Sequence, residues 1–312
     1  MPTLAPKLPW QHAFAGGYPR RGGQPLPTDP DAIDYLNRVA AADGGASVEV
    51  GIAQAIDAFV RGCKADSAGY AGDPTRSNWD AMQASCIMCG ARTLSGALVP
   101  LKGTAPTPYN FASGDYSRSG ATPGLKGNGI GKYLDTNYSD GSVGRDDIHM
   151  ATYISSFPTV SNTRYMGTSV TASGTQLQHF SSKHFVYNRS LGAYTDTGTR
   201  SLGFLATSRQ TNASYDIRQG GSTSIAALAS AAVGGQNVFV FAYNGSGPLN
   251  YSDARLAFYS VGSALDLAAM DTRVTNMVTA IRFHTLTGLL PNDYDPATIA
   301  YITAAYAAGG TL

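Results

Sequence analysis

The sequence predicts a mainly β protein with a helical part: an antiparallel β-sandwich flanked by an N-terminal α-helical bundle and by C-terminal helices. Three observations lead to this prediction. Apolar residues follow helical spacing only in residues 28–95 and after residue 265. Between these regions, short β-prone runs alternate with Gly, Ser, Asn and Asp, which is typical of antiparallel sandwiches. Charged residues make up 14% of the chain, against about 25% in ordinary soluble proteins, so small polar residues and tyrosine must cover much of the surface.

Residues 1–27 are predicted to form an extended N-terminal arm. They carry six prolines, paired glycines and the basic pair Arg20 and Arg21, and they show no apolar period. Two interpretations stay open. The segment is either an arm that lies across neighbouring subunits, with Arg20 and Arg21 as candidate assembly contacts, or a disordered end of the chain.

Residues 28–95 are predicted to form a small bundle of three helices. Asp29 is placed to cap the first helix, with Pro30 at its first position, and Gly44 and Gly45 end it. A second helix should start near Ser47. Its apolar stripe comprises Ile52, Ile56, Phe59, Val60 and Cys63. The third helix is predicted from a similar spacing of Trp79, Met82, Cys86 and Cys89.

Residues 96–265 are predicted to form the sandwich. The run Val238–Tyr243 has apolar or aromatic residues on both alternating faces, so this strand should be covered on both sides. The other clear strand candidates are Ile148–Ser155, His184–Asn188, Ser201–Ser208 and Arg255–Val261.

Residues 266–312 are predicted to be helical. The residues from Leu267 to Ile281 give one apolar face, which must pack on the sandwich or on the bundle. The segment from Asp295 to Gly309 repeats the pattern of the first helix, which indicates an internal duplication. Its Ile299 and Ile302 are candidate assembly contacts.

The cysteines and histidines are interpreted as structural residues. Three cysteines, all in the first third of the chain, argue against a disulfide framework, and Cys86 and Cys89 are expected to pack in the core. His179 and His184 lie five residues apart, so strand alternation would point them to opposite faces. They and His149 are therefore expected to be ordinary surface or strand histidines.

No cofactor is expected, although the acidic loop from Asp135 to Asp147 leaves calcium open. Asn137, Asp140 and Asp147 lie there among glycines and offer oxygen ligands. The segment Gly127–Lys132 is similar to a phosphate-binding loop, but Tyr133 stands where Ser or Thr is needed. A strand lead-in or a hairpin is the preferred interpretation.

Several classes of function are excluded by composition. The formal net charge of +1 does not favour nucleic acid as a partner. No apolar run is long enough to insert into a membrane, and a soluble protein made in a cytoplasm is expected. Glu49 is the only glutamate, so a mechanism that needs two glutamates is excluded.

Three segments together resemble a known fold family. These are the stretch Gly124–Leu134, the strand from Ile148 and the closing Arg255–Gly262 before a helix. They resemble the concanavalin A-like jelly roll of laminin-G type, above all in virion proteins of tailed bacteriophages. The resemblance spans about residues 30–290. Glucanases of this fold use a Glu-x-Asp-x-x-Glu strand, which this sequence lacks, so the resemblance does not imply hydrolysis.

The resemblance implies a non-enzymatic structural protein of a tailed-phage virion. It would be made in the host cytoplasm and displayed on the head, neck or tail, as a capsid decoration or a tail fibre, with copies of itself and other virion proteins as partners. The alternative is a lectin-like host-attachment module on a fibre or spike that binds surface glycans. Its candidate sugar contacts are Tyr133, Tyr138, Tyr243 and Tyr251. A third hypothesis is an aspartate-based glycan depolymerase.

Overall fold

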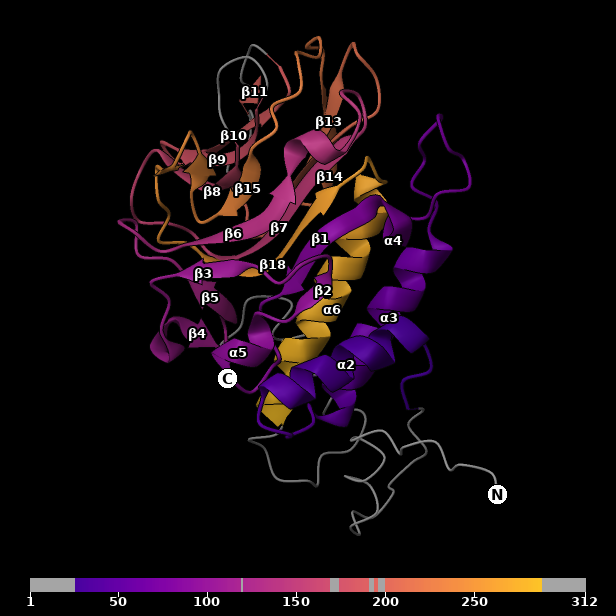
Figure 1. Ribbon diagram of the computed structural model, residues 1–312, viewed down its shortest axis with the longest axis vertical. Helices are drawn as coiled ribbons and strands as arrows, with labels where there is room; N and C mark the ends of the chain where they lie inside the picture. Colours follow the sequence, from indigo (N-terminus) through magenta and orange to yellow (C-terminus); the bar gives the residue numbers. More distant parts are fainter. Residues whose placement is uncertain (1–25, 119, 169–173, 191–193, 196–199, 288–312) are drawn as a thin grey trace.

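The computed structural model describes residues 26–118, 120–168, 174–190, 194–195 and 200–287 (Figure 1). These residues form three layers: helices, a large antiparallel sheet and a small antiparallel sheet. The mainly β fold with antiparallel sheets and a few helices is therefore confirmed. The candidate assembly contacts Arg20, Arg21, Ile299 and Ile302, and the repeated segment Asp295–Gly309, lie outside the described residues.

The helical layer contains α2 (Pro30–Ala42), α3 (Val50–Ala65) and α6 (Leu267–Thr287). The Asp29 side chain caps α2 by accepting hydrogen bonds from the backbone N–H groups of Asp31 and Ala32, as predicted. The predicted apolar stripes of α3 and α6 are buried. Two single-turn helices, α4 (Asn78–Ala81) and α5 (Leu94–Ala97), lie beside this layer (Figure 1).

Within the described residues, the large sheet has nine strands, with β14-β13-β12-β7-β18-β1-β2 as its main order and β5 and β4 attached to β18. Every pairing is antiparallel. The strands are β1 (Met82–Ile87), β2 (Pro100–Lys102), β4 (Tyr116–Ser117), β5 (Gly124–Lys126), β7 (Ile148–Ser156), β12 (Gly203–Arg209), β13 (Tyr215–Gln219), β14 (Ser222–Ala226) and β18 (Arg255–Gly262).

The small sheet has the described strand order β11-β10-β9-β8-β15-β6-β3. Its strands are β3 (Thr107–Tyr109), β6 (Tyr133–Ser139), β8 (Thr163–Gly167), β9 (Thr175–Phe180), β10 (Lys183–Asn188), β11 (Tyr194–Thr195) and β15 (Asn237–Val240). A short hairpin, β16 (Tyr243–Asn244) with β17 (Pro248–Leu249), follows β15. Two 3₁₀ turns, η1 (Ser113–Asp115) and η2 (Asp140–Ser142), complete the described elements.

Two hydrophobic cores separate the three layers. One core joins the helices to the outer face of the large sheet, where Phe59 of α3 meets Phe258 of β18 at 5.9 Å between ring centroids. The other lies between the sheets and includes Met150, Leu177 and Val240. The large sheet is thus covered on both faces by apolar residues. Among the described residues, no helix has both the length and the apolar composition that crossing a membrane requires.

The predicted third helix of the N-terminal bundle is wrong. Helical geometry stops at Ala81, and the chain continues as β1 between β18 and β2, in the interior of the large sheet. Met82 and Cys86 lie four residues apart, which fits a helical face, but Met82, Ala84 and Cys86 also alternate with the polar Gln83 and Ser85 as in a strand. Residues 28–95 are therefore not a separate bundle, and the sandwich begins at β1 instead of at residue 96. Cys86 and Cys89 are buried, as predicted, in the inter-sheet core and in the helix-facing core respectively.

Candidate binding site

The outer face of the small sheet presents aromatic and polar side chains in the positions that a core would fill with aliphatic ones. Tyr133 of β6 pairs with Tyr109 of β3, and Asp135 pairs with Phe239 of β15. Because alternate residues of a strand point to opposite sides, Tyr133 and Asp135 share the outer face. Leu134 between them is fully buried in the inter-sheet core.

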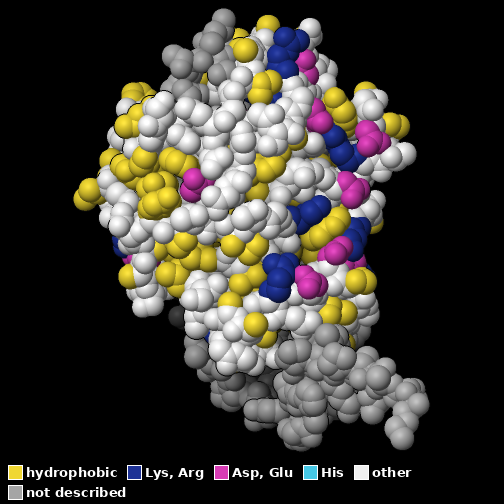
Figure 2. Space-filling view, in the orientation of Figure 1, with side chains coloured by type: hydrophobic (Ala, Val, Ile, Leu, Met, Phe, Trp, Pro, Cys, Tyr) yellow, Lys and Arg dark blue, Asp and Glu magenta, His cyan; other side chains and the backbone are white. Residues whose placement is uncertain are grey.

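Four of these side chains form what we call the aromatic cluster: Tyr109, Tyr133, Phe239 and Tyr251. The rings of Tyr109 and Tyr133 are stacked, with centroids 4.3 Å apart and planes 2° from parallel. Tyr133 also contacts Phe239 at 4.8 Å and the edge of Tyr251 at 6.2 Å. Tyr109 is 40% exposed. Figure 2 shows hydrophobic side chains gathered over β3, β6 and β15, so this edge of the sheet offers an aromatic surface to solvent.

The hydroxyl of Tyr133 in the aromatic cluster acts as a neutral group. Burial, followed by the neighbouring Tyr109 side chain, raises the pKa of Tyr133 to about 12. The hydroxyl therefore keeps its proton across the physiological range and can both donate and accept a hydrogen bond.

Oriented polar groups border the aromatic cluster. One carboxylate oxygen of Asp135 accepts from the backbone N–H of Asn137 at 2.8 Å. The other accepts from the Asn237 side-chain amide at 3.2 Å. The Asn137 amide donates to the Ala105 carbonyl at 2.8 Å. These bonds hold a carboxylate and two amides in fixed positions beside the rings.

A second polar group, the arginine cluster, lies farther along the same face and consists of Asn162, Arg164, Gln176, Gln178 and Tyr243. Arg164 donates from Nε to the side-chain oxygen of Gln176 at 2.9 Å and from Nη1 to the side-chain oxygen of Asn162 at 2.8 Å. The Gln178 amide donates to the same Asn162 oxygen at 3.2 Å. The Tyr243 ring lies 5.4 Å from the guanidinium carbon of Arg164.

The segment Asn250–Tyr251 connects the two clusters. The Asn250 carbonyl accepts from the backbone N–H of Arg164 at 2.9 Å, and its side-chain amide donates to the Asn162 carbonyl at 2.9 Å. The next residue, Tyr251, contacts the ring of Tyr133. The aromatic cluster and the arginine cluster are therefore parts of one continuous face.

Three of the four tyrosines proposed from the sequence lie on this face: Tyr133, Tyr243 and Tyr251. Tyr138 does not. Its position on β6 points it towards the inter-sheet core, where burial raises its pKa to about 12. Sequence analysis missed Tyr109, because its three-residue strand shows no alternation of its own and is recognised only by its pairing with β6.

The prediction that His179 and His184 point to opposite faces is wrong. They are directly paired residues of the β9–β10 hairpin, and both rings contact Tyr165 in the inter-sheet core. The turn residues Ser181 and Ser182 have φ angles of 46° and 63°, as a two-residue type I′ turn requires. Counting alternation along the chain ignored this reversal of direction.

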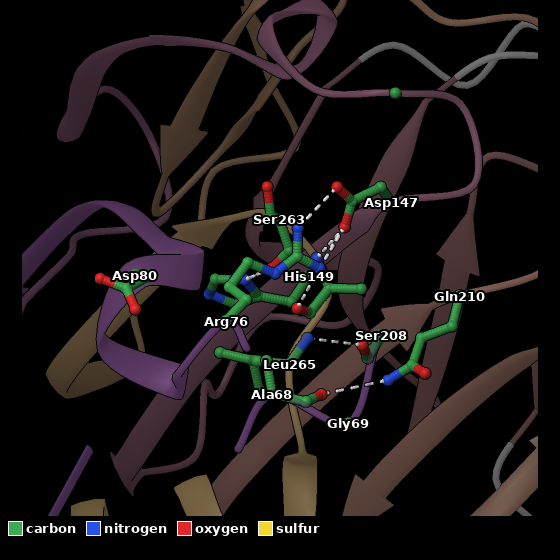
Figure 3. A network of polar contacts seen from close by, with 12 residues as sticks. Ala68, Gly69, Arg76, Asp80, Asp147, His149, Ser208, Gln210, Ser263 and Leu265 are labelled. Atoms are coloured by element: carbon green, nitrogen blue, oxygen red, sulfur yellow. Dashed lines mark hydrogen bonds and ion pairs between the residues drawn. The ribbon is translucent and has the colours of Figure 1, made fainter. Parts of the chain in front are cut away.

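A network around His149 has the residue types of a hydrolase but lies inside the protein (Figure 3). The His149 Nδ1 donates to the Ser263 carbonyl at 2.5 Å, so Nε2 is left to accept from the Ser260 hydroxyl at 2.8 Å. His149 and Ser260 are fully buried. Burial lowers the pKa of His149 to about 4. Beside it, Arg76 pairs with Asp147 at 2.8 and 2.7 Å. The network ties the loop after α3 to the large sheet.

The acidic loop does not assemble its oxygens into one centre. Buried Asp140 accepts from the Thr168 hydroxyl at 2.8 Å, while Asp147 pairs with Arg76. Asn137 donates to a backbone carbonyl. In the part of the chain that the structure describes, no group of three or more His, Cys, Asp or Glu side chains is placed to hold a metal ion.

No protein-family model and no curated protein matches the chain. Among solved structures, the botulinum neurotoxin serotype D binding domain matches with 11% identity and a TM-score of 0.43, over 63% of this chain and 51% of that one. A Trypanosoma rangeli sialidase matches with 10% identity and a TM-score of 0.40, over 73% of this chain and 40% of the sialidase. The carbohydrate-binding domain CBM40 of a Ruminococcus gnavus IT-sialidase matches with 12% identity and a TM-score of 0.34, over 50% of this chain and 98% of that domain. The chain thus spans about half the length of the toxin domain. Similarity at this level does not assign the chain to a family.

Proposed function

We propose that the chain is a carbohydrate-binding module that binds glycans through the outer face of the small sheet. The observation that carries this proposal is the stacked pair Tyr109 and Tyr133 at the sheet edge, with Tyr109 40% exposed. A sugar ring has an apolar C–H face that packs against an aromatic ring. The stack holds both rings rigid, so little entropy is lost when a sugar is bound.

The polar border of the aromatic cluster supplies the complementary part of such a site. Sugar hydroxyls need both donors and acceptors at fixed positions, and Asp135 and the amides of Asn137 and Asn237 provide them. Binding sites typically combine an apolar surface with a few convergent polar groups. The aromatic cluster and its border have this composition.

The test is binding of the purified chain to a glycan array, followed by titration of the best ligand. Tyr109→Ala should weaken binding at least tenfold, which corresponds to about 1.4 kcal/mol, because it removes the exposed ring. Ile225→Ala is the control, since Ile225 is an exposed apolar residue (66% exposed) in β14 of the large sheet, away from the proposed face. Equal losses in both variants, or no glycan bound at all, would contradict the proposal.

We propose that the site binds without cleaving. Incubation with a bound oligosaccharide should release no new reducing ends. Their release would instead favour the aspartate-based depolymerase.

Display on the surface of a tailed-phage virion is a further proposal, supported by the sequence resemblance alone. It makes copies of the chain and other virion proteins the partners. Labelling intact particles with an antibody against the purified chain should decorate the head, neck or tail. Label confined to the host cell lysate would argue against a virion component.

A further inference from the structure

Arg164 is a nearly buried cation without a carboxylate partner in the part of the chain that the structure describes. It is 8% exposed, yet no carboxylate lies within ion-pair distance of it among the described residues. Burial lowers its pKa, and the neighbours that act in the opposite direction are the hydroxyls of Tyr243 and Tyr187. Burying a charge without a counter-ion is costly. Such a residue is therefore a candidate to receive an anion.

Two other buried arginines show how this protein satisfies a purely structural guanidinium. Arg209 is fully buried and donates to four backbone carbonyls, those of Asn188, Thr211, Ser214 and Leu228. Arg189 likewise donates from both Nη atoms to backbone carbonyls of the loop between β6 and β7, although its Nε makes no hydrogen bond within the described residues. Arg164 instead contacts side-chain amide oxygens and one distant carbonyl at 3.4 Å. Within the described residues, its Nη2 has no hydrogen-bond partner.

The arginine cluster also has an acceptor without a partner. Gln178 is 6% exposed, and its side-chain oxygen makes no hydrogen bond in the described part of the chain. Its amide nitrogen and Arg164 Nη1 both donate to the same Asn162 oxygen. The unpaired Gln178 oxygen is buried, so Nη2 of Arg164 is the donor in the cluster that a ligand could use. The bond between Arg164 and Asn162 is only partly buried and Asn162 itself is exposed, so the arginine cluster reaches the protein surface at Asn162.

We propose that Arg164 binds the carboxylate of an acidic sugar and so gives the module its preference for anionic glycans. The carboxylate accepts a hydrogen bond from Nη2 of Arg164. Tyr251 and Asn250 connect the arginine cluster to the aromatic cluster. The next sugar of the bound glycan therefore lies over the rings of the aromatic cluster. This inference rests on the proposed glycan binding and names its substrate class.

The test compares matched glycans that differ only in the carboxylate. One arm uses a hexuronate oligosaccharide, and the other uses an oligosaccharide that ends in a nonulosonic acid. Each is titrated by calorimetry beside its carboxyl-reduced form. The wild-type chain should bind at least one acidic form at least tenfold more tightly than its reduced form. In Arg164→Gln this ratio should fall to about one, while Tyr109→Ala should weaken both forms alike.

The outcomes separate the two proposals. Equal binding of acidic and reduced forms by the wild-type chain would overturn the role of Arg164 and leave glycan binding intact. Binding of neither form, in either arm, would overturn both. If Arg164→Gln does not fold, the wild-type ratio measured at low and at high salt decides, because a charge-based preference must fall as salt rises. A ratio that is independent of salt would contradict the proposal.

Discussion

The outer faces of the two sheets follow the same alternation and have opposite chemistry. On the large sheet, the outward residues Ala151, Tyr153 and Phe258 lie buried under the helices. On the small sheet, the outward Tyr133 and Asp135 are only half-buried and lie beside oriented amides. The inner faces of both sheets share one apolar core. The helices therefore bury one outer face, whereas the other keeps half-buried and exposed side chains at its β3–β6 edge.

This difference between the two outer faces predicts that stability and binding depend on separate sets of residues. A change under the helices removes packed apolar surface and lowers the free energy of unfolding. A change on the small sheet's outer face alters contacts that a ligand would make, with little change in the core. The four predictions below test this separation, from the largest expected effect to the smallest.

Phe258→Ala should have the largest effect. The ring is fully buried and packs edge-on against Phe59, so its removal leaves a cavity between α3 and β18. Loss of a buried phenylalanine costs about 3–5 kcal/mol. Chemical denaturation should show this decrease in the free energy of unfolding, while glycan affinity of the remaining folded fraction is unchanged. A cost below about 1 kcal/mol would mean that the helical layer is not part of the cooperative unit.

Acidification should have the next largest effect, and it should destabilise the outer face of the large sheet that the helices cover. The pKa of His149 is about 4 in the folded chain, against 6.5 for the unperturbed side chain. The unfolded chain therefore binds the proton more readily. Stability is full above pH 6.5 and falls as the pH drops towards 4, by up to about 1.4 kcal/mol per pH unit. Burial also lowers the pKa of His179, which acts in the same direction. Denaturation curves across this range should show the decline, and a flat profile would contradict it.

Cys86→Ala should cost about 1 kcal/mol, the scale of a small core truncation. Cys86 is fully buried between the sheets, where burial raises the pKa of its thiol to about 12. The native thiol should therefore not react with a thiol-specific reagent at pH 8, and the unfolded chain should react fully. Metal analysis of the purified protein should find no bound zinc. Stoichiometric zinc, or rapid labelling of the folded chain, would overturn the packing role.

Tyr109→Ala should have the smallest effect on stability and a strong effect on binding. The side chain is 40% exposed on an edge strand and contacts the Tyr133 ring. Its loss should lower the free energy of unfolding by about 0.5 kcal/mol, the low end of the ~0.5–1.5 kcal/mol that an aromatic pair is worth beyond its buried area, because this pair is partly exposed. The same protein sample should bind glycan at least tenfold more weakly. A loss of stability as large as that expected for Phe258→Ala would contradict the separation of stability from binding.

The sequence predicted the elements that carry a clear period or a cap. Asp29, Pro30 and the paired glycines defined α2, and the apolar face from Leu267 to Ile281 defined α6. It failed at β1, where Trp79, Met82 and Cys86 fit a helical spacing although the polar Gln83 and Ser85 alternate with apolar residues as in a strand.

The candidate site was predicted only in part, because its geometry comes from pairing between strands. Tyr133 and Tyr251 were identified as aromatic residues near loops, but their contact depends on β6 and on the segment after β17. Arg164 and Gln178 gave no local signal, since they become neighbours only through the register of β8 and β9. The hairpin that pairs His179 with His184 was missed for the same reason.

The position of β18 governs the order in which the protein can fold. This last strand of the described chain enters the large sheet between β1 and β7 and pairs Ile87 with Phe258. During synthesis on the ribosome, β1 and β7 therefore wait with unpaired edges until residue 262 has emerged. Contacts so distant along the chain slow folding, and open strand edges promote aggregation. A chain that stalls or is cut before β18 would expose both edges at once, so the central sheet can close only after β18 has been synthesised.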